Sequence, residues 1–491
     1  MLHRYFFLLS FFFSLGTSYA QVANISKSDL LDVGLPVVEI ETVDGELPKC
    51  DVISGLPYGI NVNSIGNAKK VPGRLTISNK DDVLYDSGDY EDGKSGMTFK
   101  IRGNTSGLSP KKPYKIKLQK KADLLLRGDE KYENKDWVLI FDKNYYSKLG
   151  LKVNELMGLQ WTPQYMYVNV MINGKYQGLY MLLESVKRDQ KSRINVSKDG
   201  YIFEYDMYWW KEPLYVQIPT YLPWKMYYTF QYPDAEDIKE KQLAYFKEMI
   251  TAVEASIQDG TYLDYIDLKS FASWILAHDI LGTADGSGSN ILLTKYDNTD
   301  DSKVMMANLW DFDSILQMAN DWSAVHTMFY FKYLFDNNPN DTFKRAYRKR
   351  WEEVSPTIFD DLNSFIDEFS QSEEVEALNI SAEMDQELWK WDLENLSVPS
   401  VVNHFKRQLA SRKNWLAGAI SNFPSGIIKG DVNGDYAIDY NDVIEMANAI
   451  TGNPSVEYIK EAANINNDDV VNATDIVLLV KKINKTVSSQ Q

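Results

Sequence analysis

The feature that most constrains the fold is a change in the spacing of apolar residues near Ala235. Before this point, short runs with alternating apolar residues are separated by Gly, Pro, Asn and Asp, a pattern typical of antiparallel β-strands. After it, apolar residues recur at i, i+3, i+4 and i+7, as they do in helices. Strands first and helices afterwards favour an α+β fold over a doubly wound sheet.

The predicted elements follow this change of period. The strands expected in the first half span residues 37–41, 74–78, 83–85, 98–102, 113–118, 137–141, 165–172 and 177–184. The helices expected afterwards span residues 238–257 and 268–281, and residues 342–420 are expected to be mostly helical. Pro424, Ser425 and Gly426 then end the main body and are typical of a linker. A chain of 491 residues has room for roughly two to four domains.

Composition excludes several classes of function. The chain has 69 Asp and Glu residues against 52 Lys and Arg, a formal net charge of −17. So acidic a protein is a poor candidate for nucleic-acid binding, which relies on cations that neutralise phosphates. The single cysteine, Cys50, excludes an internal disulfide framework and any zinc or iron–sulfur site built from several cysteines. The four histidines form no HExxH motif, which excludes a zincin-type hydrolase.

Residues 1–20 are predicted to be a secretory signal peptide. Arg4 precedes an apolar run at residues 5–15, and small residues lead to Ala20, after which cleavage is expected. The alternative is a buried N-terminal helix. The run is too short to span a bilayer comfortably, and no later apolar stretch reaches the length of about 18 residues that spanning requires. We therefore expect a secreted protein, extracellular or periplasmic, with no transmembrane segment in the mature chain.

A twelve-residue acidic pattern occurs twice near the C-terminus. Oxygen-bearing side chains occupy positions 1, 3, 5, 9 and 12 of each copy, where EF-hand-type loops place their calcium ligands. The expected ligands are Asp431, Asn433, Asp435, Asp439 and Asp442 in loop 1, and Asn464, Asn466, Asp468, Asn472 and Asp475 in loop 2. Loop 2 has two carboxylates at these positions against four in loop 1, so we expect it to bind calcium more weakly.

Residues 428–487 resemble a dockerin domain over its full length. The resemblance implies a small all-α domain that folds with calcium and docks to a cohesin-type receptor. Position 6 departs from the EF-hand pattern, because glycine is usual there and this chain has Tyr436 and Asp469. Two alternatives are an acidic solvated tail, and a calcium-stabilised module whose partner has been lost or changed.

Residues 278–313 carry the most informative catalytic pattern. Phosphoryl transfer needs a carboxylate that receives the hydroxyl proton and oxygen ligands that hold Mg²⁺ on the phosphates. Protein kinases place these groups as D-x-x-x-x-N on one loop, with an Asp-Phe pair further along the chain. Asp285 and Asn290 have this spacing, and Asp311 and Phe312 follow an expected hairpin. The competing explanation is a helix end with turn-forming residues and a surface pair of aspartates.

Basic residues gather upstream, on two expected strands. Arg102 begins a loop of small residues, Arg-Gly-Asn-Thr-Ser, whose backbone N–H groups can approach a phosphate. Lys111, Lys112, Lys115 and Lys117 follow, and cations on one face of a strand can neutralise the phosphates of ATP. The four lysines compete for this role. The alternative is an ordinary strand whose lysines face solvent.

Acidic and aromatic residues add to the pattern. Glu184 ends one expected strand, Glu204 with Asp206 ends another, and each can orient a lysine or a metal. Residues 208–232 are rich in Tyr and Trp, which can stack an adenine or line a glycan groove. A partly buried aromatic sheet is the alternative for this stretch.

Several motifs, in order along the chain, resemble the CotH spore-coat kinase family. They are Arg-Gly-Asn-Thr-Ser at 102–106, Lys-Lys-Pro-Tyr-Lys-Ile at 111–116, Gly-Leu-Tyr at 178–180 with Glu184, Tyr-Pro-Asp at 232–234, and Trp-Asp-Phe-Asp at 310–313. The resemblance covers residues 97–420. It implies an atypical protein-kinase-like fold that transfers the γ-phosphoryl group of ATP, with Mg²⁺ or Mn²⁺, to serine or threonine on secreted proteins.

The resemblance also implies a role for each candidate residue. Asp285 would be the catalytic base, and Asn290 and Asp311 would bind the metal. The residues that would bind ATP and its phosphates are Arg102, Lys115, Lys117 and Glu184.

The prediction is thus an exported kinase tethered through a calcium-binding module. Its expected segments are a signal peptide (1–20), a β-rich N-terminal region (35–96), a kinase-like domain (97–423) and a dockerin-like domain (428–487). Its expected partners are a secreted or surface protein substrate and, where one exists, a cohesin-type receptor. The alternative is a non-catalytic surface, adhesion or scaffold protein on a degenerate kinase fold. A glycosidase is a more remote third option, because paired carboxylates are plentiful.

Overall fold

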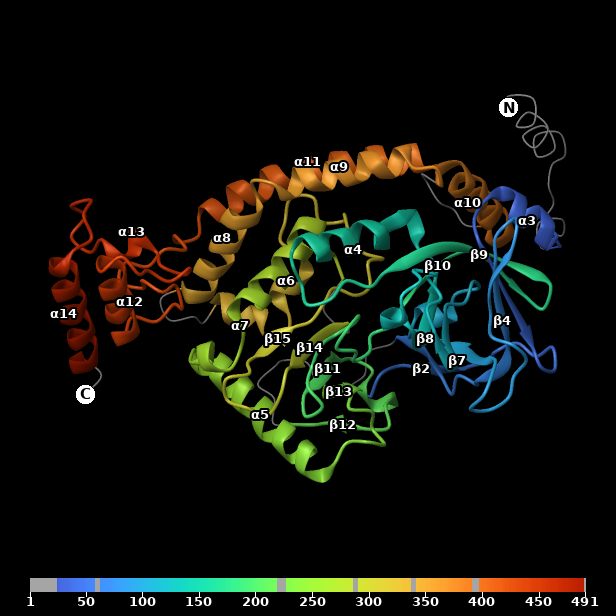
Figure 1. The fold of residues 1–491 in the computed structure, drawn as a ribbon, viewed down its shortest axis with the longest axis horizontal. Coiled ribbons are helices and arrows are strands. Elements are labelled where there is room, and N and C mark those ends of the chain that lie inside the picture. The colour runs from blue at the N-terminus through green and yellow to red at the C-terminus, as the bar shows by residue number, and fades with distance from the viewer. Residues whose placement is uncertain are drawn as a thin grey trace.

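The computed structural model describes residues 24–57, 62–218, 227–285, 290–336, 341–390 and 397–489. Within these ranges most strands precede most helices, and the fold is α+β, as predicted (Figure 1). The signal-peptide prediction lies outside the described residues. Among the described helices, none combines the length and apolar character that crossing a bilayer requires.

A large sheet forms the first part of the molecule. In spatial order its strands are β1 (Val37–Thr42), β9 (Tyr165–Ile172), β10 (Lys175–Glu184), β8 (Asn134–Ile140), β7 (Tyr114–Ala122), β6 (Met97–Ile101), β4 (Val71–Ser78) and β5 (Val83–Asp86). β1 also pairs with β4, so the sheet closes into a barrel with β5 attached to β4. Strands before residue 97 pair with strands after it, so one sheet crosses the predicted boundary between residues 96 and 97.

The barrel interior is filled by alternate residues of its strands. In β7, Tyr114, Ile116 and Leu118 are buried, while Lys115 and Lys117 point to the other face. The interior cluster includes Leu75, Phe99, Ile116, Trp137, Val168 and Tyr180. The period of two in the sequence therefore marks the inward face of the barrel.

A helix that the sequence analysis did not predict interrupts the strands. It is α4 (Tyr146–Leu156), which follows β8 and packs on two later helices, α6 (Leu268–Leu281) and α9 (Ile358–Gln371). Asp142 supports its first turn, since the Oδ1 atom of Asp142 accepts the backbone N–H of Ser147 at 2.7 Å and satisfies an amide that the first turn leaves open.

A second sheet carries the segments that follow the barrel. Its strands, in spatial order, are β12 (Tyr215–Val216), β13 (Tyr227–Tyr232), β11 (Tyr201–Asp206), β14 (Ile291–Lys295) and β15 (Val304–Met306). Phe203 and Tyr228 of this sheet pack on Phe246 of α5 (Glu240–Asp259). Much of the aromatic stretch is therefore a partly buried sheet. β2 (Asp51–Ser54) and β3 (Asn63–Gly66) form a separate pair.

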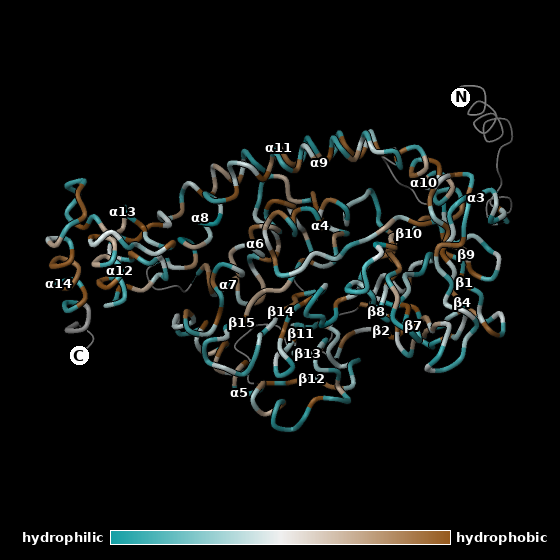
Figure 2. Tube along the Cα trace, viewed as in Figure 1, coloured by the Kyte–Doolittle hydropathy of each residue, from teal (hydrophilic) through white to brown (hydrophobic). Residues whose placement is uncertain are grey.

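Helices pack against both sheets. α6 is buried along almost its whole length, as a central helix should be. α11 (Val398–Ser421) runs along one side of the molecule, and hydrophobic and hydrophilic residues alternate along it, as in a helix with one buried face (Figures 1 and 2). The remaining helices of this part are α3 (Lys27–Val33), α7 (Phe331–Asp336), α8 (Thr342–Val354) and α10 (Val375–Trp389).

The C-terminal region is a small helical unit at one end of the molecule, beside α8 (Figure 1). It contains α12 (Tyr440–Ile450), α13 (Lys460–Ala463) and α14 (Ala473–Ser489). The cluster of Val432, Met446, Ala463, Leu479 and Ile483 forms its own hydrophobic core. Helices follow both acidic loops, as the repeated pattern predicted.

Candidate functional site

Four of the predicted residues come together where the end of β6 meets the loops around β14 and β15. Asp285 follows α6, Asn290 immediately precedes β14, Asp311 follows β15, and Arg102 follows β6. The Nδ2 atom of Asn290 donates to Oδ2 of Asp311 at 3.3 Å. Arg102 and Asp285 both lie near enough to Asp311 to change its pKa. Residues far apart in the sequence thus share one site.

Asp285 is exposed, and its backbone is held by the segment that follows Asp311. The backbone N–H of Asp285 donates to the Ser314 Oγ atom at 2.9 Å, and this hydroxyl donates back to the Asp285 carbonyl at 2.8 Å. The N–H of Ala284 donates to the Ser314 carbonyl at 3.0 Å. Ser314, which the sequence analysis did not single out, therefore connects the two segments of the catalytic pattern.

Asn290 and Asp311 both adopt left-handed backbone conformations, with φ of 68° and 69°. Such conformations are uncommon for residues other than glycine, and they occur at sites that the surrounding structure holds firmly. For Asn290 the support comes from Glu204 of β11, whose Oε1 atom accepts the Asn290 N–H at 2.9 Å. Residues 286–289, between the predicted base and Asn290, lie outside the described ranges.

The carboxylates of this cluster resist ionisation. Burial, with Asp206 nearby, raises the pKa of Glu204 to about 8, and burial raises the pKa of Asp206 to about 6. The side chain of Asp311 is exposed, but the surrounding protein atoms desolvate its carboxyl and raise its pKa; Asp285 adds to the shift and Arg102 opposes it. Desolvation and the Asp311 charge raise the pKa of Asp313 to about 7. A cation bound among these groups would remove the cost of their charges.

Arg102 faces this acidic cluster from the barrel side. Desolvation lowers its pKa, while Asp311 and Glu204 act in the opposite direction, so a guanidinium stays charged there. Its Cζ atom lies 5.8 Å from the ring centre of Trp310, at the start of the Trp-Asp-Phe-Asp motif. Sequence reasoning missed Trp310 as a partner of the arginine, although it adjoins the predicted metal ligand.

The small-residue loop after Arg102 is tightly packed. Gly103 has φ of 83°, and a Cβ atom there would lie 2.1 Å from Oγ of Ser106. The next residue, Asn104, accepts a hydrogen bond at 2.6 Å from the Nζ atom of Lys211, in the short 3₁₀ helix Trp209–Lys211. This bond joins the loop to the second sheet, and no motif in the sequence indicates it.

The structure separates the four competing lysines. The Nζ atom of Lys111 is buried and donates to Oδ1 of Asp385 at 2.6 Å, and the Nζ atom of Lys112 donates to the Gly107 carbonyl at 3.0 Å. Lys115 instead lies on the outer barrel face, near Arg102. Desolvation, with Lys187 nearby, lowers the pKa of Lys115 to about 8. Lys117 lies two residues further along the same face and is exposed.

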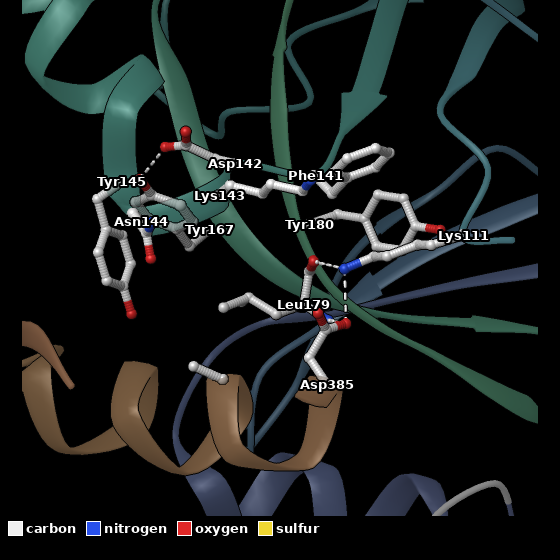
Figure 3. A pocket seen from close by; sticks show the side chains of 11 residues that line it. Lys111, Phe141, Asp142, Lys143, Asn144, Tyr145, Tyr167, Leu179, Tyr180 and Asp385 are labelled. Atoms are coloured by element: carbon white, nitrogen blue, oxygen red, sulfur yellow. Dashed lines mark hydrogen bonds and ion pairs between the residues drawn. The ribbon is translucent and has the colours of Figure 1, made fainter. Parts of the chain in front are cut away.

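Figure 3 shows a pocket that is separate from the predicted catalytic residues. The Lys111–Asp385 ion pair occupies one side, and Lys111 also donates to the carbonyl of Leu179. Tyr180 lies beneath the ammonium, with the ring centre 4.5 Å from Nζ. The charges of Lys111 and Asp385 therefore neutralise each other, and we assign the pair a structural role.

Glu184 does not join the cluster. It is 1 % exposed, its Oε1 atom accepts from Arg127 at 3.0 Å, and its Oε2 atom accepts the backbone N–H of Gln164 at 3.1 Å. In the sheet it shares a row with Trp137, whereas Lys115 shares a row with Val138, so the two side chains point to opposite faces. This placement gives no support to the predicted contact between Glu184 and phosphate.

The two acidic loops near the C-terminus have matching geometry. Asp442 caps loop 1, with Oδ1 accepting the Val432 N–H at 2.6 Å, and Asp475 caps loop 2, with Oδ1 accepting the Ile465 N–H at 2.8 Å. Position 6 is left-handed in both, with φ of 68° at Tyr436 and 69° at Asp469. Both loops therefore have the sharp turn that calcium loops of this type use, although neither has glycine there.

The acidic groups of loop 1 fit a cation. The Oδ1 atom of Asp431 is buried and has no hydrogen-bond partner. Desolvation, followed by the charges of Asp435 and Asp442, raises the pKa of Asp431 to about 6. Across the described residues, no three His, Cys, Asp or Glu side chains are arranged as a metal site by themselves, so a cation would also need oxygens from Asn side chains and the backbone.

Comparison with known proteins agrees with these observations. Residues 99–416 match the family model described as CotH kinase protein, and residues 429–484 match the dockerin type I domain. No curated protein matches the chain. A solved structure of the Helicobacter pylori proinflammatory kinase CtkA is similar at 10% identity and a TM-score of 0.28, covering 58% of this chain and 90% of that one.

The CotH match spans well over half of the chain, and it includes Arg102, Asp285, Asn290 and Asp311. The dockerin match includes both acidic loops. The protein therefore belongs to the CotH kinase family and carries a C-terminal dockerin type I domain.

Proposed function

We propose that this protein is an exported, ATP- and Mg²⁺-dependent Ser/Thr protein kinase of CotH type, tethered through its calcium-binding dockerin domain. The observation that carries the proposal is the meeting of Asp285, Asn290, Asp311 and Arg102 from four separate segments. Under this proposal, residues 97–423 form an atypical kinase-like domain that includes the barrel, and residues 428–487 form the tether. The export step would depend on residues 1–20.

Each residue of the cluster has a task in phosphoryl transfer. Asp285 is exposed, so its carboxylate can accept the proton of a substrate serine or threonine hydroxyl. Asp311 and Asn290 would hold Mg²⁺ or Mn²⁺, which when bound neutralises charge on the transferred phosphoryl group. Arg102 and Lys115 would bind the phosphates from the barrel side. The pKa of Lys115 is lowered to about 8, and an incoming anion would favour its protonated, charged form.

Glu204 supports this arrangement without touching the substrate. Its hydrogen bond fixes the backbone of Asn290, and Asn290 in turn donates to Asp311. We assign Glu204 as a positioning residue. The dockerin domain would bring the kinase to a cohesin-type receptor and so to a secreted or surface protein substrate.

The test is transfer of the γ-phosphoryl group from labelled ATP with Mg²⁺ or Mn²⁺. Autophosphorylation of the mature protein is measured first, because it needs no known substrate. We expect label on the wild type and none on Asp285→Ala or Asp311→Ala. Lys117→Ala, on the same exposed face but further along the strand, serves as a charge-removal comparison that should keep more activity. A folded wild type that neither takes up label nor binds ATP with metal would contradict the proposal.

A non-catalytic adhesion or scaffold protein is the second candidate, and one observation favours it. Trp209, Tyr215 and Tyr227 form a cluster of rings, with both Tyr215 and Tyr227 centred 4.6 Å from Trp209, and Tyr215 is 39% exposed. Such a cluster can stack on a sugar or another planar group. Binding of a glycan by a protein that fails the phosphoryl-transfer test would favour this candidate.

A further inference from the structure

At its sharpest turn, loop 1 has a residue in an unfavourable backbone conformation. Tyr436 occupies position 6 with φ of 68°, a conformation that costs a residue with a Cβ atom about 1–2 kcal/mol. Glycine would adopt it without this cost. Asp469 has the same position and φ in loop 2, but its side chain is exposed. The tyrosine therefore needs a compensating contact, and the structure shows one.

The ring of Tyr436 packs against the main hydrophobic core of the kinase domain. On α8, the Nζ atom of Lys349 lies 5.6 Å from the ring centre. Desolvation, with the charges of Asp431 and Glu353, raises the pKa of the Tyr436 hydroxyl. Lys349 and Glu353 are four residues apart and lie on one face of α8. The turn of loop 1 thus packs against that face of α8.

The linker before the dockerin domain is fastened to the same helix. The Nη1 atom of Arg345 donates to the Ser425 carbonyl at 2.7 Å, and Arg348 donates to the carbonyl of Phe423. A Cβ atom on Gly426 would lie 2.7 Å from Cβ of Lys349, so glycine fits here where a larger residue would not. The linker residues around Ser425 therefore follow the surface of α8.

The other face of α8 reaches the base of the catalytic segment. The hydroxyl of Tyr347 donates to Oδ2 of Asp279 at 2.7 Å, near the end of α6. The backbone carbonyl of Asp279 accepts from Nε of Arg412 at 2.8 Å, and the guanidinium of Arg412 also donates to the Met318 carbonyl at 2.6 Å. Gly282 to Asp285 follow directly, so α8 lies between loop 1 and the residues that support the predicted base.

Loop 1 without a cation brings like charges together. Asp431, Asp435 and Asp442 lie within one twelve-residue loop, and the buried Oδ1 atom of Asp431 has no hydrogen-bond partner that would offset its charge. The backbone N–H of Tyr436 also donates to Oδ2 of Asp431, at 3.1 Å, so the position of the tyrosine depends on the same carboxylate that calcium would bind. Binding of calcium would relieve the repulsion and hold the turn in the shape that presents Tyr436 to α8.

We propose that α8 is a docking surface for the calcium-loaded loop 1 of the same chain, and that Tyr436 couples calcium binding to the stability of the kinase domain. The dockerin domain is then more than a tether. Calcium at loop 1 would stabilise α8 and, through Tyr347 and Asp279, the base of the catalytic segment. The proposal rests on calcium binding by the dockerin domain and does not depend on kinase activity.

The experiment is amide hydrogen exchange of the full mature chain, with added calcium or with a chelator. In the wild type, we expect calcium to slow exchange both in the dockerin domain and in α8. At calcium 100 times the dissociation constant, linkage limits the gain in protection to about 100-fold. Tyr436→Gly keeps a turn that favours glycine, so its dockerin domain should still respond to calcium, while the response of α8 should be lost.

Asp469→Gly is the matched control, because it makes the same change at position 6 of loop 2. This variant should keep the calcium response of α8. Two results would overturn the proposal. One is a wild type whose dockerin domain responds to calcium while α8 does not. The other is a Tyr436→Gly variant in which α8 responds as strongly as in the wild type.

Discussion

The ring of Phe312 lies directly on Gly150 of α4, so close that a Cβ atom on the glycine would come within 2.0 Å of the ring atom Cδ1. Phe312 follows Asp311, the predicted metal ligand, and is 6 % exposed. The helix that the sequence analysis missed is therefore the helix against which the Asp-Phe pair is packed. Asn154 of the same helix makes a second contact with this segment, because its Oδ1 atom accepts the Leu309 N–H at 2.7 Å.

This contact predicts that Gly150→Ala displaces Phe312. Alanine gains about 1 kcal/mol of helix propensity, but overpacking of a core costs about 1–3 kcal/mol. We expect a lower free energy of unfolding in denaturant titration and a larger loss of autophosphorylation than stability alone explains. Gly418→Ala is the control, because this glycine also lies in a helix and a Cβ atom there meets nothing within 4 Å. That variant should be as stable as the wild type or more stable.

The raised pKa of Glu204 predicts a pH-dependent gain in stability for Glu204→Gln. The folded pKa of about 8 lies above the value of 4.5 for an ordinary glutamate, so the folded protein favours the protonated form. The contribution of Glu204 to the free energy of unfolding of the wild type is fully present below pH 4.5 and is lost as the pH rises towards 8. Glutamine stays neutral, so the variant should gain about 1–3 kcal/mol over the wild type at pH 8 and little at pH 4.5.

Unfolding titrations at several pH values would measure this difference. Activity should fall although stability rises, because a bound metal would favour the ionised carboxylate of Glu204 and glutamine cannot supply that charge. A stability difference that does not grow with pH would show that Glu204 is not held in its protonated form.

Substitutions of Lys111 and Lys115 are predicted to change different properties, stability for Lys111 and ATP binding for Lys115. Lys111→Met leaves Asp385 buried without its cation, which should lower the free energy of unfolding by about 3–5 kcal/mol. Adding Asp385→Leu should recover most of this loss, because the pair is then replaced by apolar side chains. Lys115→Met should leave stability nearly unchanged and weaken ATP binding, measured by calorimetry. Equal ATP affinity in Lys115→Met and the wild type would remove Lys115 from the phosphate site.

The dockerin loops are predicted to bind calcium with different affinities. Loop 1 offers four carboxylates and loop 2 offers two, so a calcium titration by calorimetry should show a tighter and a weaker step. Asp431→Ala should abolish the tighter step, because it removes a buried ligand oxygen that has no other partner. Asp468→Ala should affect only the weaker step. A variant that loses the opposite step would reverse this assignment.

Periodicity determined much of the architecture directly from sequence. The alternation in Tyr114 to Leu118 marks both the strand and its inward face, because a strand has a period of two and only one face of β7 is apolar. The helical spacing of residues 268–281 matches α6 in full. The two acidic loops were recognisable because each is local, with its ligands spaced along twelve consecutive residues.

The sequence could not decide which lysine faces the site. Lys111 and Lys115 lie in one short stretch of similar residues, and only the packing of α10 against β10 brings Asp385 to Lys111 and so commits it to a structural pair. The sequence could not predict the partner of Glu184 either. Its partner Arg127 lies 57 residues earlier in the chain, and no local pattern connects them.

Local pattern thus determined most of the elements, the order of the motifs and the two acidic loops, since these depend on residues close together in the chain. Tertiary structure alone decided which charges meet. It closed the strands into one barrel, brought Glu204 to Asn290, set Phe312 on Gly150 and seated Tyr436 on α8. The physical reason is that burial and pairing of a charged or aromatic group depend on neighbours from distant segments, which become neighbours only when the chain is packed.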